Sequence, residues 1–258
     1  MFRKSNNLVV GLTTFHHEFL KLSVSGLSGF NKKITLIIHN DNPCKRLKKR
    51  AIRKLGYRGR LHIINSNENI GLIKSRVSIL DFIKQNKISG QWFMFANDDD
   101  VVLGANTPNL SDNIFAIMGN AVVVKSKLLD VFRVMESRCN YTIDGTDVIL
   151  NAPHVGMAGT IVRMQYVLSY GEFLSSVMPS ICECISDAPF KMPVDTIMWN
   201  GFVEFMRATQ PEMTPIYMNQ TNYLMTKLNS TRYATDNQNT KLVARALAVV
   251  AAALRGNE

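Results

Sequence analysis

Three adjacent carboxylates follow an apolar run in the stretch WFMFANDDDVVL, residues 92–103. The run is typical of a buried strand, and Asp98, Asp99 and Asp100 come directly after it. Because neighbouring carboxylates repel one another, a cation beside them would stabilise the turn. Mg²⁺ and Mn²⁺ prefer oxygen ligands and often bind one or two carboxylates together with substrate phosphates. The pattern favours a divalent metal site, and the alternative is a solvated turn that caps the next helix.

Strands and helices alternate along the chain up to this turn. Apolar, β-branched runs predict strands at 8–15, 32–40, 61–65 and 91–96. Pro43, with Leu47, Ala51 and Leu55 at helical spacing, predicts a helix that opens at Pro43, and residues 70–86 predict another. This alternation is typical of parallel β-α-β units, in which ligands bind beyond the carboxyl ends of the strands. We therefore expect the polar residues after the four strands to converge.

The motifs at these strand ends resemble the A-type fold of nucleotide-sugar glycosyltransferases, nearest to the family 2 group. The strand that ends in Asp-x-Asp is one of them, and NIGLIKSR at 69–76 is similar to that family's Asn-x-Gly-x-x-x-x-Arg segment. HNDNP at 39–43 stands where the family has an acidic residue after its second strand, and LTTFHH at 12–17 is similar to the first-strand end. The resemblance covers residues 8–103 well and the remainder loosely. Asn97 departs from the family pattern, which has an acid there.

The resemblance implies an α/β fold with a mostly parallel, Rossmann-like sheet. Residues 1–103 would form the nucleotide-sugar-binding half and residues 104–258 the acceptor-binding half of one compact domain. The implied reaction is metal-dependent transfer of a sugar from a nucleotide-diphosphate sugar, expected to be a UDP-sugar, to an acceptor hydroxyl.

The same resemblance implies roles for individual residues. Asp98 and Asp100 would bind Mn²⁺ or Mg²⁺. Asp195, at the start of a predicted helix over 194–208, would be the general base, although it could instead be only an N-cap. Asp187 and Glu183 are rival bases, followed by Asp144 and Asp147. The implied donor contacts are Thr13, Phe15, Asp41, Asn69, Gly71, Lys74, Arg76, Asp98 and Asp99.

Basic residues are concentrated in the first part of the chain. Residues 1–60 contain 14 Lys or Arg and two acids, and residues 45–60 contain nine basic residues and no acid, among them Lys48, Lys49, Arg50 and Arg53. Such a field attracts polyanions, either an anionic membrane surface or nucleic acid. The acceptor is therefore expected to be a surface glycan or lipid-linked saccharide. The alternatives are a hydroxymethylated base in DNA, as in certain phage enzymes, and a non-catalytic protein that binds nucleic acid or a membrane surface.

The composition bounds the class of protein. With 258 residues, 46% hydrophobic and 19% charged, the chain is long and apolar enough for one large folded domain. No apolar run reaches the ~20 residues of a membrane span, the first 15 residues do not form a signal peptide, and four cysteines do not indicate a disulfide framework. We expect a cytoplasmic protein, or one in the host cytoplasm if it is viral, with peripheral membrane contact left open. A sugar nucleotidyltransferase is disfavoured because GLTTFHHEF, at 11–19, lacks a Gly-rich, Arg-Lys signature.

Overall fold

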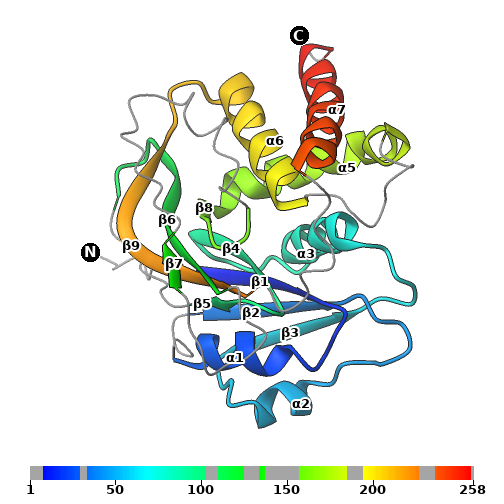
Figure 1. Cartoon of the computed structure of the whole chain (residues 1–258), viewed down its shortest axis with the longest axis vertical. Helices are drawn as coiled ribbons and strands as arrows, with labels where there is room; N and C mark the ends of the chain where they lie inside the picture. Colours follow the sequence, from blue (N-terminus) through cyan, green and yellow to red (C-terminus); the bar gives the residue numbers. More distant parts are fainter. Residues whose placement is uncertain are drawn as a thin grey trace.

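A computed structural model describes most of the chain (Figure 1). The described residues are 8–29, 34–102, 110–124, 134–136, 157–184, 194–226 and 236–256. Three of the rival base residues, Asp144, Asp147 and Asp187, lie outside these ranges. The predicted boundary at residue 103 also lies outside them, so the division into two halves stays a prediction.

The first half consists of parallel strands joined by helices, as the sequence predicted. Its elements are β1 (Leu8–Thr14), α1 (Leu20–Ser28), β2 (Ile34–Asn40), α2 (Lys49–Lys54), β3 (Arg60–Asn65), α3 (Leu72–Gln85) and β4 (Trp92–Asn97). The strands lie in the order β3-β2-β1-β4, and every neighbouring pair is parallel. All four carboxyl ends therefore reach one edge of the sheet.

The sheet continues into the second half without a break. Its further elements are β5 (Val101–Val102), β6 (Ile114–Val124), β7 (Val134–Glu136), β8 (Ile161–Arg163), α5 (Met164–Cys184), α6 (Val194–Thr209), β9 (Thr214–Thr226) and α7 (Asp236–Arg255). In the described parts the order is β3-β2-β1-β4-β8-β6-β9-β5, with β7 beside β6. The short strand β8 pairs antiparallel with both β4 and β6 and so joins the two halves.

Helices cover both faces of the sheet (Figure 1). Helices α1 and α2 lie on one face, and α3, α5, α6 and α7 lie on the other. Strand β1 shows how the sequence specifies these layers: Leu8, Val10 and Leu12 belong to the core under α1 and α2, whereas Val9 belongs to the core under α3. This alternation is the period of two that a strand with two buried faces requires. Gly11 also faces α3, where a Cβ atom would come within 2.8 Å of the Phe93 ring and 2.9 Å of Ile79.

The prediction that Pro43 opens a helix is wrong. Helix α2 begins only at Lys49, Leu47 lies before it, and Ala51 is exposed while Ile52 is the buried residue. Side chains from the neighbouring strand ends hold the preceding segment instead. Asn65 accepts a hydrogen bond from the Leu47 N–H at 2.7 Å and donates to the Leu47 carbonyl at 3.2 Å, and Asn40 donates to the Lys45 carbonyl at 2.9 Å. These bonds satisfy backbone groups that a helix starting at Pro43 would have used.

None of the helices among the described residues has the length and apolarity needed to cross a lipid bilayer. The cytoplasmic location stays a prediction.

Candidate functional site

Polar groups from the carboxyl ends of β1 to β4 meet at one edge of the sheet. The Asp41 N–H donates to the Thr14 carbonyl at 2.8 Å, and the Ser66 N–H donates to the Asn40 carbonyl at 2.9 Å. The Asn40 side chain also donates to Asn65 Oδ1 at 2.9 Å, which joins the ends of β2 and β3. The expected convergence of the strand ends is therefore present, and it forms the floor of the candidate site.

Asp98 turns toward the end of β1. Its Oδ2 accepts a hydrogen bond from the Thr14 hydroxyl at 2.7 Å and from the Phe15 N–H at 3.3 Å. Burial raises the pKa of the Asp98 carboxyl above its ordinary value of 3.8, although the hydrogen bonds from Thr14, His16 and Phe15 oppose that rise. The ionised carboxylate is therefore poorly solvated, which is the condition that a bound cation would relieve.

Asp100 is buried and is bound by Asn97, the last residue of β4. Only 3% of this residue is exposed, and its Oδ2 accepts a hydrogen bond from the Asn97 amide at 3.0 Å. Asp99, between the two, is half-exposed. The acidic turn thus presents three carboxylates in three different environments.

Arg76 links this turn to Asp195, the predicted base. Its Nη2 lies 2.8 Å from Asp195 Oδ1 and 3.0 Å from Asn97 Oδ1, and its side chain is fully buried. The Asp195 side chain is 30% exposed. Residues from α3, β4 and α6, far apart in the sequence, are therefore in direct contact.

Asp195 is more than a cap for its own helix. Both hydrogen bonds that the structure gives to its Oδ1 come from outside α6, one from Arg76 and one from the Ala158 N–H at 2.9 Å. The position in the first turn of α6 also favours a negative charge there. The rival Glu183 is exposed in the last turn of α5.

The predicted donor contacts Asp41, Asn69 and Gly71 meet where the chain enters α3. Asp41 accepts the Ile70 N–H on Oδ1 at 2.8 Å and the Gly71 N–H on Oδ2 at 2.9 Å, and Asn69 Oδ1 also accepts the Gly71 N–H at 3.1 Å. Gly71 has φ +80°, and a Cβ there would meet nothing within 4 Å, so the backbone is open on that side. These side chains fix the start of α3 and hence the place of Arg76 one turn later.

The remaining predicted donor contacts differ in exposure. Lys74 is exposed on α3, Phe15 is 36% exposed, and Thr13 is buried with 6% of its surface accessible. Thr13 pairs with His39 and with Asn97 in the sheet register, so it lies at the site edge within the strands. Their role in donor binding stays a proposal.

The sequence did not identify four residues whose side chains make hydrogen bonds at the site: Thr14, Asn40, Asn65 and Asn97. Each is a polar residue at the last position of an apolar strand, and that shared position is the signal that could have identified them. Each has at least one partner on another element, and no local spacing encodes such contacts.

The donor set fits a divalent cation that is shared with a ligand. Among the described residues no group of three or more His, Cys, Asp or Glu side chains is arranged to hold a metal by itself. Mg²⁺ and Mn²⁺ bound together with a diphosphate need only one or two carboxylates from the protein. Asp98 and Asp100 supply this number, and the raised pKa of Asp98 is what a cation would reverse.

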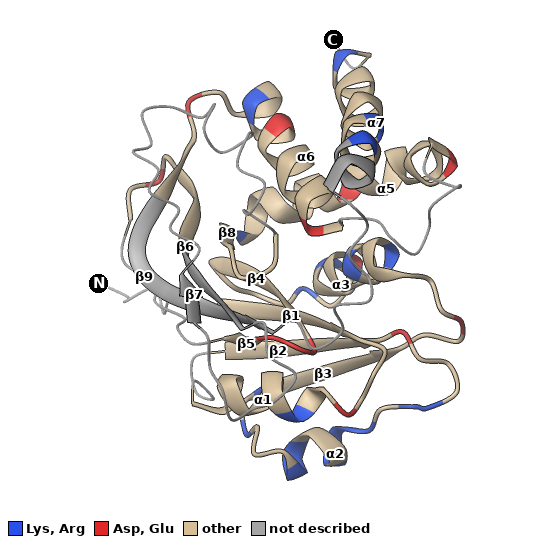
Figure 2. Cartoon of the chain, viewed as in Figure 1, with Lys and Arg blue, Asp and Glu red and all other residues tan. Residues whose placement is uncertain are grey.

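The basic segment 45–60 forms a surface at α2 and the loop that enters it (Figure 2). Lys48, Lys49 and Arg50 are exposed, and their contact with a polyanion stays a prediction. Arg53 is different, because it is half-buried and donates hydrogen bonds to the carbonyls of Tyr57 at 3.0 Å and Gly59 at 2.8 Å. Arg53 therefore stabilises the α2–β3 connection.

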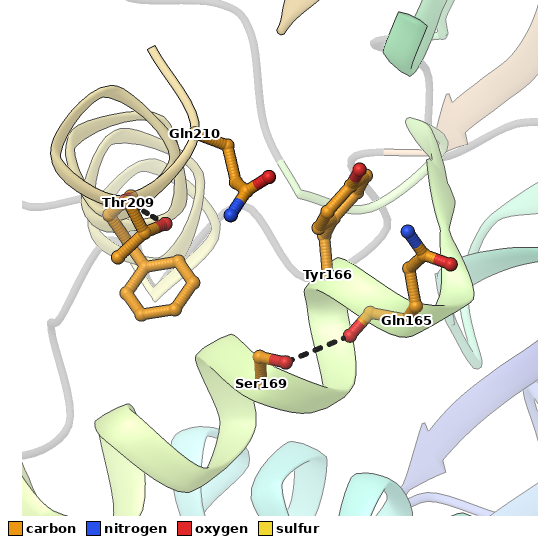
Figure 3. Close-up of a pocket in the computed structure, with 6 residues that line it drawn as sticks. Gln165, Tyr166, Ser169, Thr209 and Gln210 are labelled. Atoms are coloured by element: carbon orange, nitrogen blue, oxygen red, sulfur yellow. Dashed lines mark hydrogen bonds between the residues drawn. The ribbon is translucent and has the colours of Figure 1, made fainter. Parts of the chain in front are cut away.

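A separate pocket of about 310 Å³ lies between α5 and the end of α6 (Figure 3). Its polar lining includes Ser169 and Thr209, whose hydroxyls donate to helix carbonyls, and it contains no carboxylate, histidine, lysine, arginine or thiol. It lies at the far end of α6 from Asp195, about 20 Å along the helix axis. The hydroxyls of its lining have no carboxylate, imidazole or amine beside them within that lining to activate them.

Solved structures with this arrangement of elements are known, although no protein-family model and no curated protein matches the sequence. A structure of TarS from S. aureus superposes with a TM-score of 0.52 at 13% identity and covers 93% of this chain and 70% of that one. A second TarS structure gives 0.50 at 14% identity, with 85% of this chain and 36% of that one covered. GalNAc-T7, solved with UDP, GalNAc and Mn²⁺, gives 0.51 at 9% identity, with 85% and 43% covered.

This chain spans less than half the length of the last two of these structures. The matched structures have the glycosyltransferase A-type fold. The predicted fold class, an α/β A-type fold with a Rossmann-like parallel part, is confirmed.

Proposed function

We propose that this protein is a metal-dependent glycosyltransferase that moves a sugar from a nucleotide-diphosphate sugar to an acceptor hydroxyl. The observation that carries the proposal is the contact between Arg76, Asn97 and Asp195, which places the acidic turn after β4 and the carboxylate of α6 at one site. In this fold ligands bind beyond the carboxyl ends of the strands. The donor would bind beside the acidic turn, and the acceptor would bind beside Asp195.

The acidic turn is the donor side of the proposed reaction. Asp98 and Asp100 would hold Mn²⁺ or Mg²⁺, with Asp99 beside the ribose or supporting the metal. The bound metal would act as a Lewis acid that stabilises the charge on the leaving diphosphate. Support comes from the poorly solvated Asp98 carboxylate and from GalNAc-T7, a protein of the same fold solved with UDP and Mn²⁺. We therefore propose a UDP-sugar donor.

The nucleotide would lie along the ends of β1 and β2 and the start of α3. Thr13, Phe15, Asp41, Asn69 and Gly71 line this edge. The open backbone at Gly71 allows close approach of a ligand, and the exposed Lys74 offers a positive charge to a phosphate. Arg76 was predicted to contact the base or phosphates, but its buried side chain already binds Asp195 and Asn97.

Asp195 is the proposed general base on the acceptor side. The acceptor O–H transfers its proton to the Asp195 carboxylate while the acceptor oxygen bonds to the sugar carbon and the diphosphate leaves with the bonding electron pair. The 30% exposure of Asp195 leaves room for a hydroxyl to approach, whereas its Oδ1 stays fixed by Arg76 and Ala158.

The acceptor is proposed to be a hydroxyl of a surface glycan or a lipid-linked saccharide. The exposed basic surface around Lys48, Lys49 and Arg50 favours a second candidate, in which the acceptor is a hydroxymethylated base in DNA held by its phosphates. A base in a duplex would have to be turned outward to reach Asp195. A non-catalytic binder would use the same surface without turnover.

A panel of sugar nucleotides tests the proposal. The purified protein is incubated with each donor and Mn²⁺, with and without hydroxymethylcytosine DNA or a lipid-linked saccharide, and products are read by mass. We expect hydrolysis or transfer with a UDP-sugar and its near-complete loss in Asp100→Ala. An unchanged rate in that variant contradicts the metal role of Asp100, and no turnover with any donor favours a binding protein.

A further inference from the structure

We infer that Arg76 and Asn97 are positioning residues that hold the carboxylates of Asp100 and Asp195 in one fixed arrangement. The inference rests on the proposed function, because it assigns these carboxylates to the donor and acceptor sides of one reaction. It adds two residues whose role is to set the distance between those sides.

The first step is the environment of Arg76. Its side chain is 0% exposed, its Cζ lies 5.1 Å from the centre of the Phe95 ring, and its Nη1 lies 3.6 Å from Met198 Sδ. A buried guanidinium is costly unless its charge is paired. Its charged partner is Asp195 on α6, and this ion pair holds Asp195 beside α3.

The second step is the double use of one nitrogen. Arg76 Nη2 contacts Asp195 Oδ1 on α6 and Asn97 Oδ1 at the end of β4. The two hydrogens of Nη2 can serve one acceptor each while the planar guanidinium lies over the Phe95 ring, and a lysine ammonium on a flexible stem lacks this planar contact and the fixed direction of its N–H groups. Arg76 therefore fixes α6 relative to the acidic turn.

The third step explains why residue 97 is an asparagine. Its Oδ1 accepts from Arg76 at 3.0 Å, and its Nδ2 donates to Asp100 Oδ2 at 3.0 Å. A carboxylate at this position has no proton to donate and would add a like charge beside Asp100. The departure of Asn97 from an all-acidic turn is thus required by the connection from Arg76 to Asp100.

Backbone N–H groups of residues 157 and 158 also hold Asp195 in place. Its carbonyl accepts the Met157 N–H at 3.2 Å, and its Oδ1 accepts the Ala158 N–H at 2.9 Å. The next residue, Gly159, donates its N–H to the Phe95 carbonyl of β4 at 2.9 Å. Backbone and side chain thus tie the start of α6 to the end of β4 separately, which leaves Asp195 little freedom to move.

Metal binding in Asn97→Ala tests the Asn97 part without requiring turnover, because alanine removes both the donor to Asp100 and the acceptor for Arg76 and adds no charge. Free Mn²⁺ is titrated by electron paramagnetic resonance in the presence of UDP. We expect the variant to bind Mn²⁺ about 10- to 100-fold more weakly, the usual effect of removing a group that orients a ligand. A folded Asn97→Ala protein with wild-type Mn²⁺ affinity overturns the inference.

The exchanged variant Asn97→Asp/Asp100→Asn separates folding from metal binding. In this variant the amide at position 100 can donate to the carboxylate at position 97, and the net charge is that of the wild type. Its melting temperature is therefore expected to be higher than that of Asn97→Asp alone and close to that of the wild type. Its Mn²⁺ affinity is expected to stay weak, because position 100 now carries an amide. If Mn²⁺ affinity recovers with the melting temperature, Asn97 acts only on stability and the inference fails.

Arg76→Lys tests the acceptor side, with Arg163→Lys as the matched control. Arg163 is also a buried arginine, stacked 4.8 Å from the Trp92 ring at the opposite end of β4. We expect kcat to fall about 10- to 100-fold in Arg76→Lys with a nearly unchanged KM for the donor, and no such change in Arg163→Lys. Equal effects of the two changes, or an unchanged kcat in Arg76→Lys, contradict the positioning role. If wild-type protein binds neither Mn²⁺ nor UDP, the proposed function itself fails and the inference with it.

Discussion

At the scale of single residues, the acidic turn is defined by what each carboxylate contacts. Asp98 faces β1 through Thr14, and Asp100 faces Asn97. The sequence identified the three acids and Asp195 because runs of like charge and an acid at a helix start are visible locally. It could not identify the partners, since Thr14, Arg76 and Ala158 reach these acids only through the fold.

Asp98→Asn should change stability in a pH-dependent way. Burial raises the pKa of Asp98 in the folded protein above 3.8, the ordinary value that applies to the unfolded chain. The folded protein therefore binds the Asp98 proton more tightly than the unfolded chain does. This contribution to stability is fully present below pH 3.8 and is lost as the pH rises through the folded pKa. Asparagine carries no charge and escapes this loss. We therefore expect the metal-free variant to melt at a higher temperature than wild type at pH 7, with the difference disappearing below about pH 4.

Differential scanning fluorimetry across this pH range provides the measurement, and the exposed Glu212→Gln is the control. Mn²⁺ with UDP should raise the melting temperature of the wild type more than that of Asp98→Asn. A variant that is less stable than wild type at pH 7 and unaffected by pH would show that Asp98 is a structural acceptor for Thr14.

Asp195→Asn should separate donor binding from transfer. The amide is nearly the same size and keeps an acceptor for Arg76 and Ala158, but it cannot take up a proton from the acceptor hydroxyl. Loss of a general base typically costs about 10²- to 10⁴-fold in rate. We expect a fall of this size in kcat, while the affinity for UDP measured by calorimetry stays near that of the wild type. A decrease of less than tenfold would assign the base to another acid.

At the scale of elements, the start of α3 matters most, because it places Arg76. The strands β1 to β4 and the helix α3 could be predicted since their apolar residues recur at periods of two and 3.6. The start of α2 could not, because Asn40 and Asn65 bind the backbone before it through contacts across the sheet edge. Strand β8 has three residues and leaves too short a pattern to recognise.

Asp41→Asn should loosen the entry to α3. Asp41 is buried, and its two oxygens accept the N–H groups of Ile70 and Gly71. An amide nitrogen in place of one oxygen removes one of these hydrogen bonds and brings two donors face to face, although the Gly71 N–H keeps Asn69 as an acceptor. The expected cost is about 1–3 kcal/mol in the free energy of unfolding. Urea denaturation measures it, with the exposed Glu68→Gln as the control. Unchanged stability together with weaker UDP binding would show that Asp41 acts only on the nucleotide.

At the scale of the whole molecule, the longest basic run and the acidic turn lie at different places. The basic surface covers α2 and the loop before it, while the acidic turn lies at the sheet edge (Figure 2). Beneath the basic surface Leu47, Ile52 and Tyr57 are buried, and α2 has only six residues. The surface therefore offers charge without an apolar face for insertion into a bilayer, so its contact with an anionic membrane or with nucleic acid would be electrostatic.

Removing three exposed charges tests which polyanion this surface binds. Lys48→Gln/Lys49→Gln/Arg50→Gln leaves Arg53 in its structural place and is compared with Lys21→Gln/Lys87→Gln/Lys241→Gln, which removes the same charge from exposed sites elsewhere. We expect only the first variant to bind duplex DNA more weakly by fluorescence anisotropy, with a salt slope smaller by up to about three. Equal loss in both variants would mean a non-specific charge effect, and retained DNA binding with lost binding to phosphatidylserine vesicles would indicate a membrane surface.

The central claim is that the acidic turn binds a metal ion together with the diphosphate of a nucleotide. Crystals grown with UDP and Mn²⁺ and measured at the manganese edge test it most directly. The account predicts an anomalous peak within about 2.5 Å of a carboxylate oxygen of Asp98 or Asp100 and of a diphosphate oxygen. UDP bound elsewhere, or bound at this edge with no manganese beside the turn, would contradict it.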